Sequence, residues 1–377
     1  MSRYTIKHEK IADRLILLSS FWLLFIKCFP LPDVLVNGSI AVVGIICFFY
    51  YLFHGKVVQR QRILLFNIFL SVCMSFSVFY NRNAGFDNIL WIWAYSGVAM
   101  LIVEYGVSKS TGFLVFWTSA AVLFIFASSG RRPEEFYQFG SANNVTAILL
   151  YAYFIYFVSS IYSQKSSNLS MLPPIVFLLV SIWSSNRSGL IVAAFMFLGI
   201  VMLNFTMGEG KNRIRLIVSV AILFVAAIFY WDSIYYAIGE DFSVKMERYE
   251  MESVRVDIWS EYVSTAFSNM YDFLFGVSHN DPLRTPLLNY WDGNTHNCFL
   301  MLHSKYGILG FVAFIYLIIK KLIISIKEKQ FYASFIIMVV IIRGFFDWVA
   351  FPGLLDVAFF WFIFKQFKKD DYKQQSC

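Results

Sequence analysis

Charged residues are scarce in this chain, and their scarcity sets its class. They make up 15% of the 377 residues, against 59% hydrophobic and 20% aromatic residues. About a quarter of an average soluble domain is charged. Apolar runs long enough to cross a bilayer as helices follow one another, without the alternating pattern of β-barrel strands. The composition therefore excludes a soluble protein and predicts an all-α polytopic membrane protein, with one transmembrane helical domain over residues 1–377.

Several sequence motifs for catalysis and cofactor binding are also absent. The chain has no GxxxxGK[ST] phosphate loop, no GxGxxG fingerprint, no HExxH metal motif and no GxSxG nucleophile motif. Its 5 cysteines form no CxxC pair, so they predict small packing residues rather than a zinc site or a disulfide framework. No Asp-x-Asp pair lies on the predicted outer face. We therefore expect neither a metal nor a cofactor.

The apolar runs predict twelve membrane-spanning helices. The first run leads to Phe29-Pro30-Leu31-Pro32 without a small-residue cleavage site, so we expect it to remain in the mature protein. The predicted spans are residues 14–30, 34–53, 63–80, 88–105, 113–129, 145–162, 171–186, 188–206, 215–231, 298–323, 331–350 and 352–367.

Basic residues predict the orientation of these spans. With twelve spans, the basic clusters all fall on one side of the membrane, which the positive-inside rule assigns to the cytoplasm. Both termini are then cytoplasmic, and residues 232–297, between the ninth and tenth helices, form one long periplasmic loop. The residues on the cytoplasmic side are Lys7, Lys10, Arg14, Lys56, Arg60, Arg62, Lys109, Lys165, Lys211, Arg213, Arg215, Lys320, Lys321, Lys327, Lys329, Lys365, Lys368, Lys369 and Lys373.

The predicted loop is acidic within a basic chain. Its 11 Asp/Glu and 4 Lys/Arg give it a charge of −7. Because the net charge of the whole chain is +7, the rest of the chain carries +14. Basic charge in short connectors and tails indicates lipid orientation and not a nucleic-acid partner. Apolar residues at helical spacing predict an amphipathic helix on the membrane surface or on the bundle, so the loop is expected to be partly helical and to contribute to an active site. These residues are Ile258, Trp259, Tyr262, Val263, Ala266 and Phe267.

Three residues on the predicted outer face could carry chemistry. Arg187, in the tight connection between the seventh and eighth spans, either snorkels to lipid headgroups or clamps a phosphate with its planar fork of donors. Arg255 lies on the predicted amphipathic helix, where it could instead pair with Asp257 or Glu252. His296 precedes the tenth span and is either solvent-facing or a general base, because the ordinary pKa of histidine is about 6.5.

Further residues are candidates for substrate binding. Asn297 and His303 follow the candidate base and are expected to contact the substrate, and His279 is a second candidate base. Arg343 is also expected to contact the substrate, although its helical spacing to Asp347 predicts an ion pair as well.

Short segments occur in a fixed order along the chain. They are Phe139-Gly140-Ser141-Ala142-Asn143-Asn144, Ser184-Ser185-Asn186-Arg187-Ser188-Gly189-Leu190, Arg255-Val256-Asp257-Ile258-Trp259, Asp272-Phe273-Leu274-Phe275-Gly276-Val277, His296-Asn297-Cys298-Phe299-Leu300 and Tyr306-Gly307-Ile308-Leu309-Gly310. No segment is specific alone, but in this order, over residues 140–310, they resemble the O-antigen polymerase and O-antigen ligase superfamily. One departure is that Gly276 is followed by Val-Ser rather than by a second glycine.

The resemblance implies an activity and a location. Family members transfer glycans from undecaprenyl diphosphate on the periplasmic face of the bacterial inner membrane, as multi-pass glycosyltransferases. It implies that Arg187 and Arg255 hold the donor diphosphate and that His296 activates the acceptor hydroxyl, roles that suit two guanidiniums and an imidazole. The expected partners are lipid-linked oligosaccharides, membrane lipids and a chain-length regulator.

Three functions remain open on the sequence. The leading hypothesis is a polymerase that joins lipid-linked repeat units of a surface polysaccharide, such as that of lipopolysaccharide, by a metal-independent inverting transfer. The second is a ligase that uses the same donor and a lipid A–core acceptor. The third is a transporter or flippase, which is less favoured because the spans are poor in charge and show no repeat between halves.

Overall fold

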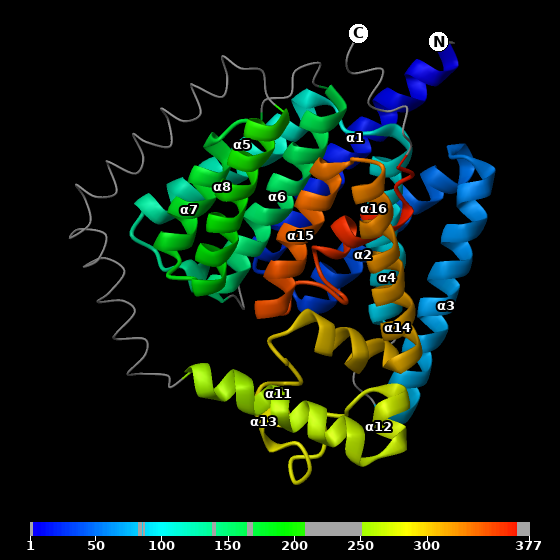
Figure 1. Cartoon of the computed structure of the whole chain (residues 1–377), viewed down its shortest axis with the longest axis vertical. Coiled ribbons are helices and arrows are strands. Elements are labelled where there is room, and N and C mark those ends of the chain that lie inside the picture. The colour runs from blue at the N-terminus through cyan, green and yellow to red at the C-terminus, as the bar shows by residue number, and fades with distance from the viewer. Residues whose placement is uncertain are drawn as a thin grey trace.

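The computed structural model describes residues 3–81, 85, 87–137, 141–163, 169–207 and 251–367. All regular structure in these ranges is helical, and 7 helices are long and apolar enough to cross a membrane (Figure 1). The prediction of an all-helical membrane protein is therefore confirmed. These helices are α2 (Asp33–His54), α3 (Val57–Asn81), α4 (Asp87–Tyr105), α5 (Lys109–Ser128), α6 (Ala142–Ser163), α8 (Arg187–Met207) and α14 (Cys298–Lys327).

The predicted count of twelve spans is not confirmed. The predicted span 215–231 lies outside the described residues, and the predicted span 352–367 contains a helix, α16, of only 9 residues. A helix rises about 1.5 Å per residue, so α16 alone is too short for a hydrocarbon layer of about 30 Å. The other helices that pack in the bundle are α1 (Arg3–Phe25), η1 (Ile26–Cys28), η2 (Pro133–Phe136), α7 (Leu172–Trp183), α15 (Phe331–Phe346) and α16 (Asp356–Phe364).

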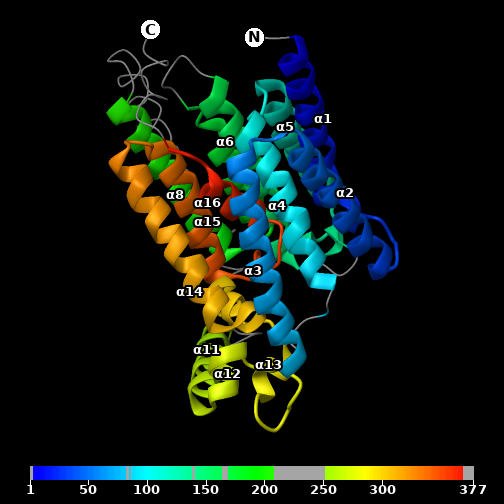
Figure 2. The same cartoon turned by 90° about the vertical axis from the view of Figure 1, so that its right-hand side faces the viewer.

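Residues 251–297 form a layer across one end of the bundle, which we call the end layer (Figures 1 and 2). It contains α11 (Met251–Ser268), α12 (Met270–Phe275) and α13 (Pro286–Tyr290). The predicted amphipathic helix is α11, which buries Ile258, Tyr262 and Ala266 while Phe267 is exposed. The end layer therefore has a small apolar core of its own, separate from that of the bundle.

The opposite end of the bundle carries the described beginning of α1 and the end of α16 (Figure 1). Near the start of α1, Nδ1 of His8 lies 2.9 Å from the hydroxyl of Tyr50, in the last turns of α2. Arg62, near the start of α3, lines the same cavity as Lys321 in α14 and Phe364 in α16. Thus α1 runs antiparallel to α2, and α3 runs antiparallel to α14 and α16.

Asparagine side chains set the starts of three helices near the end layer. The Oδ1 atom of Asn186 accepts a hydrogen bond from the backbone N–H of Gly189 at the start of α8. Asn269 accepts in the same way at the start of α12, and Asn297 at the start of α14. The first N–H groups of a helix have no partner within it, so such side chains stabilise its first turn by about 1 kcal/mol.

Burial divides the bundle into a centre and a rim. In α6, 83% of the apolar window is buried, against 22–56% in the other six candidate spans. A helix that is apolar on all sides belongs in the centre of a bundle. Large apolar side chains on α2, α3 and α14 are exposed, including Phe53, Leu65 and Leu309. These side chains form the outer, lipid-facing surface expected of a membrane protein.

Helix α14 is kinked at Gly307, whose φ of 64° and ψ of −176° are not helical. Its first part crosses the end of the bundle beside α12, and its second part runs along the bundle (Figures 1 and 2). A Cβ atom at Gly307 would collide with the carbonyl oxygen of Leu274, and one at Gly276 with that of Ser304. The two glycines therefore let α12 and α14 approach closely.

Candidate functional site

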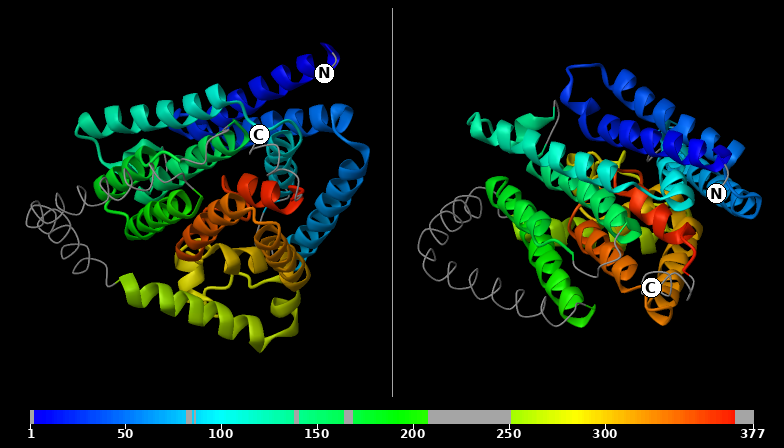
Figure 3. Two further views of the ribbon diagram at one scale, coloured as in Figure 1. Left: turned by 45° about the horizontal axis from the view of Figure 1, so that its top comes forward. Right: turned by 90° about the horizontal axis from the view of Figure 1, so that it is seen from above.

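Two of the predicted site residues donate hydrogen bonds to the C-terminal end of α15. Nη1 of Arg255, from α11, donates a hydrogen bond of 3.1 Å to the carbonyl oxygen of Phe346. Nδ2 of Asn297 donates one of 3.0 Å to the carbonyl oxygen of Phe345. The last carbonyls of a helix lack partners within it and carry partial negative charge, which favours a cation such as Arg255. These two bonds fix the end layer to α15. Figure 3 (left) shows α11 running across this end of the bundle.

Arg343 is fully buried and joins three helices. Its Nη1 donates to Oγ of Ser188 at 2.7 Å, and its Nη2 donates to the carbonyl oxygen of Asn143 at 3.0 Å. Nη2 also lies 3.0 Å from Oδ2 of Asp347. The predicted ion pair is therefore confirmed, and the bonds of Arg343 to Ser188 and Asn143 tie α15 to α8 and α6. Contact of Arg343 with substrate stays a prediction.

His296 lies beside the same carboxylate. Its Nδ1 atom is 3.9 Å from Oδ1 of Asp347, an ion-pair distance that is longer than a hydrogen bond, and its side chain is 12% exposed. Nδ1 is buried and has no hydrogen-bond partner among the described residues. The ring packs edge-on against Trp291, with centroids 5.3 Å apart. The His296 ring is therefore adjacent to both the carboxylate of Asp347 and the indole of Trp291.

The backbone at His296 is unusual, with a φ of 50°. Its N–H donates to Oδ1 of Asn294 at 2.8 Å, and the hydroxyl of Thr295 donates to the carbonyl oxygen of Asn297 at 2.9 Å. Nε1 of Trp259 donates to the carbonyl oxygen of Thr295 at 2.8 Å. Side chains of the end layer therefore hold this left-handed turn, which histidine adopts more readily than bulkier residues do.

Arg187 is the first residue of α8, one position before the serine that contacts Arg343. The turn before it, residues 184–186, is held by Asn186, whose Nδ2 donates to Oγ1 of Thr146 at 2.7 Å. The hydroxyl of Ser188 donates to Oδ1 of Asn186 at 2.7 Å. Arg187 is half-buried, and its backbone lies next to the buried network around Arg343. Its predicted phosphate contact is untested.

The two other histidines of this region differ in their surroundings. His303 is buried, with Nδ1 2.7 Å from the hydroxyl of Tyr262 and Nε2 2.9 Å from the carbonyl oxygen of Phe273. The carbonyl oxygen of Phe273 can only accept, so Nε2 donates to it and, in the neutral ring, Nδ1 accepts from the hydroxyl of Tyr262. Burial, and then the charge of Lys305, lowers the pKa of His279 and favours its neutral form.

His303 and Asn297, which were predicted to contact the substrate, form hydrogen bonds within the protein. Both ring nitrogens of His303 bond to the end layer, and Asn297 both caps α14 and bonds to α15. These bonds assign them to positioning His296 and the kinked start of α14. Their contact with substrate stays a prediction.

Sequence reasoning missed Lys305 and Trp348. Lys305 is 7% exposed, and its Nζ lies 5.8 Å from the centroid of the Trp348 ring. The backbone N–H of Trp348 donates to Oδ1 of Asp347 at 2.8 Å, and its indole Nε1 is buried without a hydrogen-bond partner in the described ranges. The signal for Lys305 was present, because a lysine inside a predicted span is costly unless it serves a function.

Several basic residues lie near the end of α15. Arg343 pairs with Asp347, and the charge of Arg255 also acts on that carboxylate. Lys305 lies over the ring of the neighbouring Trp348, and Arg187 directly precedes Ser188. The arrangement suits a polyanion such as a diphosphate, with His296 beside it as a group that can take up a proton.

Comparison with known proteins supports the resemblance. Residues 174–315 match the family model described as O-antigen ligase. The match spans Arg187, Arg255 and His296, whereas Arg343 and Asp347 lie beyond it. A search among curated proteins found no match. Residues 174–315 therefore form a domain that matches the O-antigen ligase family, in agreement with the resemblance of the sequence to the O-antigen polymerase and O-antigen ligase superfamily.

Proposed function

We propose that this protein is an O-antigen or surface polysaccharide polymerase. It joins oligosaccharide repeat units carried on undecaprenyl diphosphate, in the bacterial inner membrane, with its site facing the periplasm. The observation that supports this most directly is the approach of Arg255 and His296 to the end of α15, around Asp347 and beside the start of α8. These residues are remote in sequence, and the family match covers all three predicted catalytic residues.

The proposed reaction is a single displacement. The acceptor hydroxyl of one repeat unit attacks the anomeric carbon of the donor sugar, and the bond from that carbon to the diphosphate oxygen breaks. Arg187 and Arg255 bind the diphosphate and neutralise the charge it gains on leaving. His296 takes the proton of the acceptor hydroxyl. Attack from the side opposite the leaving group inverts the anomeric configuration.

Asp347 has a positioning role in this proposal. At 3.9 Å from Nδ1, its carboxylate favours the imidazolium that forms when His296 accepts the proton. Arg343 holds that carboxylate from the other side. Lys305 adds positive charge near the departing diphosphate, through its position on Trp348.

The periplasmic orientation rests on charge. The end of the bundle with Arg62, Lys320 and Lys321 is rich in basic residues, which the positive-inside rule assigns to the cytoplasm. The end layer then lies in the periplasm, where lipid-linked repeat units are joined.

A ligase is the second candidate, and the description of the matched family favours it. Both enzymes would use the same donor and the same base, and they differ in the acceptor. A deletion strain separates them. Lipid A–core that carries one repeat unit indicates a polymerase, whereas bare core with accumulating lipid-linked polymer indicates a ligase.

Catalysis itself is tested with the purified full chain in detergent and undecaprenyl diphosphate-linked repeat units as the sole substrate. A polymerase converts them to longer lipid-linked products and releases undecaprenyl diphosphate. A transporter or flippase leaves them unchanged, and this result would overturn the proposal.

A further inference from the structure

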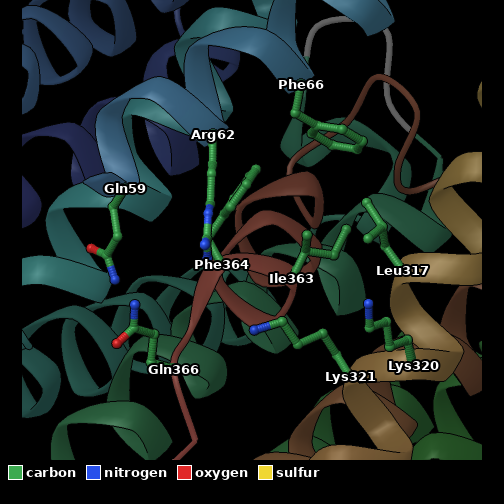
Figure 4. Close-up of a pocket in the computed structure, with 9 residues that line it drawn as sticks. All are labelled: Gln59, Arg62, Phe66, Leu317, Lys320, Lys321, Ile363, Phe364 and Gln366. Carbon is green, nitrogen blue, oxygen red and sulfur yellow. The ribbon is translucent and has the colours of Figure 1, made fainter. Parts of the chain in front are cut away.

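A cavity of about 350 Å³ lies at the end of the bundle remote from the end layer (Figure 4). It opens between the first turns of α3, the last turns of α14 and the end of α16. None of its lining residues belongs to the candidate site. The lining residues are Gln59, Arg62, Phe66, Leu317, Lys320, Lys321, Ile363, Phe364 and Gln366.

The lining carries positive charge without a carboxylate. Arg62, Lys320 and Lys321 contribute the charge, and none of the lining residues within the described ranges is an aspartate or a glutamate. In Figure 4 these three side chains reach into the space between the two helices and the chain after α16. Nζ of Lys321 donates to the carbonyl oxygen of Lys365 at 2.7 Å, which fixes it at the cavity. Cations held this close repel one another, and a bound anion relieves the repulsion.

The cavity also offers a polar group for a hydroxyl. The amide side chains of Gln59 and Gln366 both line it, and they lie side by side in Figure 4. A phosphodiester accepts hydrogen bonds from the cations but has no proton to donate to an amide oxygen. A ligand with both a phosphate and a hydroxyl can bind the cations and the amides together.

The remaining walls are apolar. Phe66, Leu317, Ile363 and Phe364 line the cavity beside the cations. On the outer face of α14, Tyr316, Ile319 and Ile323 are exposed within the same turns. An acyl chain can lie along this surface while its headgroup enters the cavity. The combination of basic rim, hydroxyl acceptor and apolar wall is that of a lipid headgroup site and not of a site for a soluble sugar.

We propose that this cavity binds the phosphate of an anionic phospholipid whose headgroup carries hydroxyls, as in phosphatidylglycerol. The proposal does not depend on the transfer reaction, because the candidate site lies at the other ends of α3 and α14. Free phosphate shares the charged part of this chemistry, and the experiment separates the two sources.

The test uses the purified full chain in a neutral detergent. Its thermal unfolding and binding curve are measured with dioctanoyl phosphatidylglycerol, with dioctanoyl phosphatidylcholine and with inorganic phosphate. The test variant combines Arg62→Gln and Lys320→Gln, both at exposed positions. The control combines Lys327→Gln and Lys329→Gln, which remove the same charge from exposed positions near the same end of α14 but outside the cavity.

Phosphatidylglycerol is expected to raise the unfolding temperature of the natural protein and of the control. In the test variant its affinity falls at least about tenfold, since each basic residue near a membrane surface contributes about 1 kcal/mol toward anionic lipid. Arg62→Lys in the Lys320→Gln background restores part of the affinity. Equal stabilisation by inorganic phosphate would identify the free ion as the ligand and overturn the assignment to a phospholipid. Equal binding of phosphatidylcholine, or equal loss in the control, overturns the proposal.

Discussion

Nη2 of Arg343 lies 3.0 Å from Oδ2 of Asp347, one helical turn further along the chain, and the Arg343 side chain has no exposed surface. Such a pair gains little over apolar residues when both partners are present, but the loss of one partner leaves a buried charge alone. The other carboxylate oxygen of Asp347, Oδ1, lies 3.9 Å from Nδ1 of His296. Structure and proposed chemistry are thus coupled through one aspartate.

Removal of Arg343 is expected to destabilise the whole bundle. Arg343→Met leaves Asp347 buried without its cation and removes the bonds to Ser188 and Asn143, which costs about 3–5 kcal/mol. The measurement is thermal unfolding of the purified protein in detergent. The control is Arg131→Met, since Arg131 is exposed and its charge lies 5.6 Å from the Phe126 ring. An unchanged midpoint for Arg343→Met would show that the ion pair does not hold the helices together.

His296→Ala is expected to abolish chain extension while the protein still folds, because the base that accepts the hydroxyl proton is lost. Activity is followed as the conversion of lipid-linked repeat units to longer products, with protein amount checked by immunoblot. His54→Ala is the matched control, because His54 is exposed near the far end of α2. Product at near-natural levels from His296→Ala would remove the assignment and direct attention to His279 or His303.

Arg187→Lys and Arg255→Lys are each expected to lower kcat/KM about a hundredfold. Lysine keeps the charge but not the planar fork that binds two phosphate oxygens, and one lost donor at a developing anion costs roughly this factor. In Arg255→Lys the bond to the Phe346 carbonyl is lost as well. Arg132→Lys, at an exposed position, is expected to leave the rate unchanged. Natural rates in both variants would exclude bidentate phosphate binding.

Gly307→Ala is expected to separate the end layer from the bundle. The new Cβ collides with the Leu274 carbonyl and also takes a left-handed φ of 64°. Gly130→Ala is an informative control, because its φ is 74° but nothing lies within 4 Å of the new Cβ. We expect a loss of about 1 kcal/mol for Gly130→Ala from backbone strain alone. Gly307→Ala should lose clearly more stability, and protease cleavage of the end layer should increase. Equal losses would show that the contact with α12 is unimportant.

Part of the fold follows from the sequence, because length and apolarity alone predict a membrane helix. The runs that became α2, α4 and α8 were predicted within a few residues. The prediction of a span at residues 352–367 is not confirmed, because apolar composition does not distinguish a spanning helix from a short buried one such as α16. The kink at Gly307 could not be predicted from the sequence either, because it depends on the contact with α12.

The candidate site was predictable in its residue types but not in its connections. Arginine on the side with few positive charges pointed to Arg187 and Arg255. The approach of Asp347 to His296 links residues about 50 positions apart through the packing of α14 on α15, and no local pattern encodes it. Lys305 could have been selected as a charge within an apolar run.

The kink in α14 also determines how much of the helix can lie across the hydrocarbon interior of a bilayer. A straight helix of 30 residues would measure about 45 Å, which exceeds the roughly 30 Å thickness of a bilayer's hydrocarbon interior. The stretch after Gly307 measures about 30 Å at the same rise per residue and matches that thickness. His296, just before the transverse part, then lies beyond the stretch that matches this thickness. For the proposed function, a substrate on a polyprenyl tail would therefore meet it at the edge of the apolar layer.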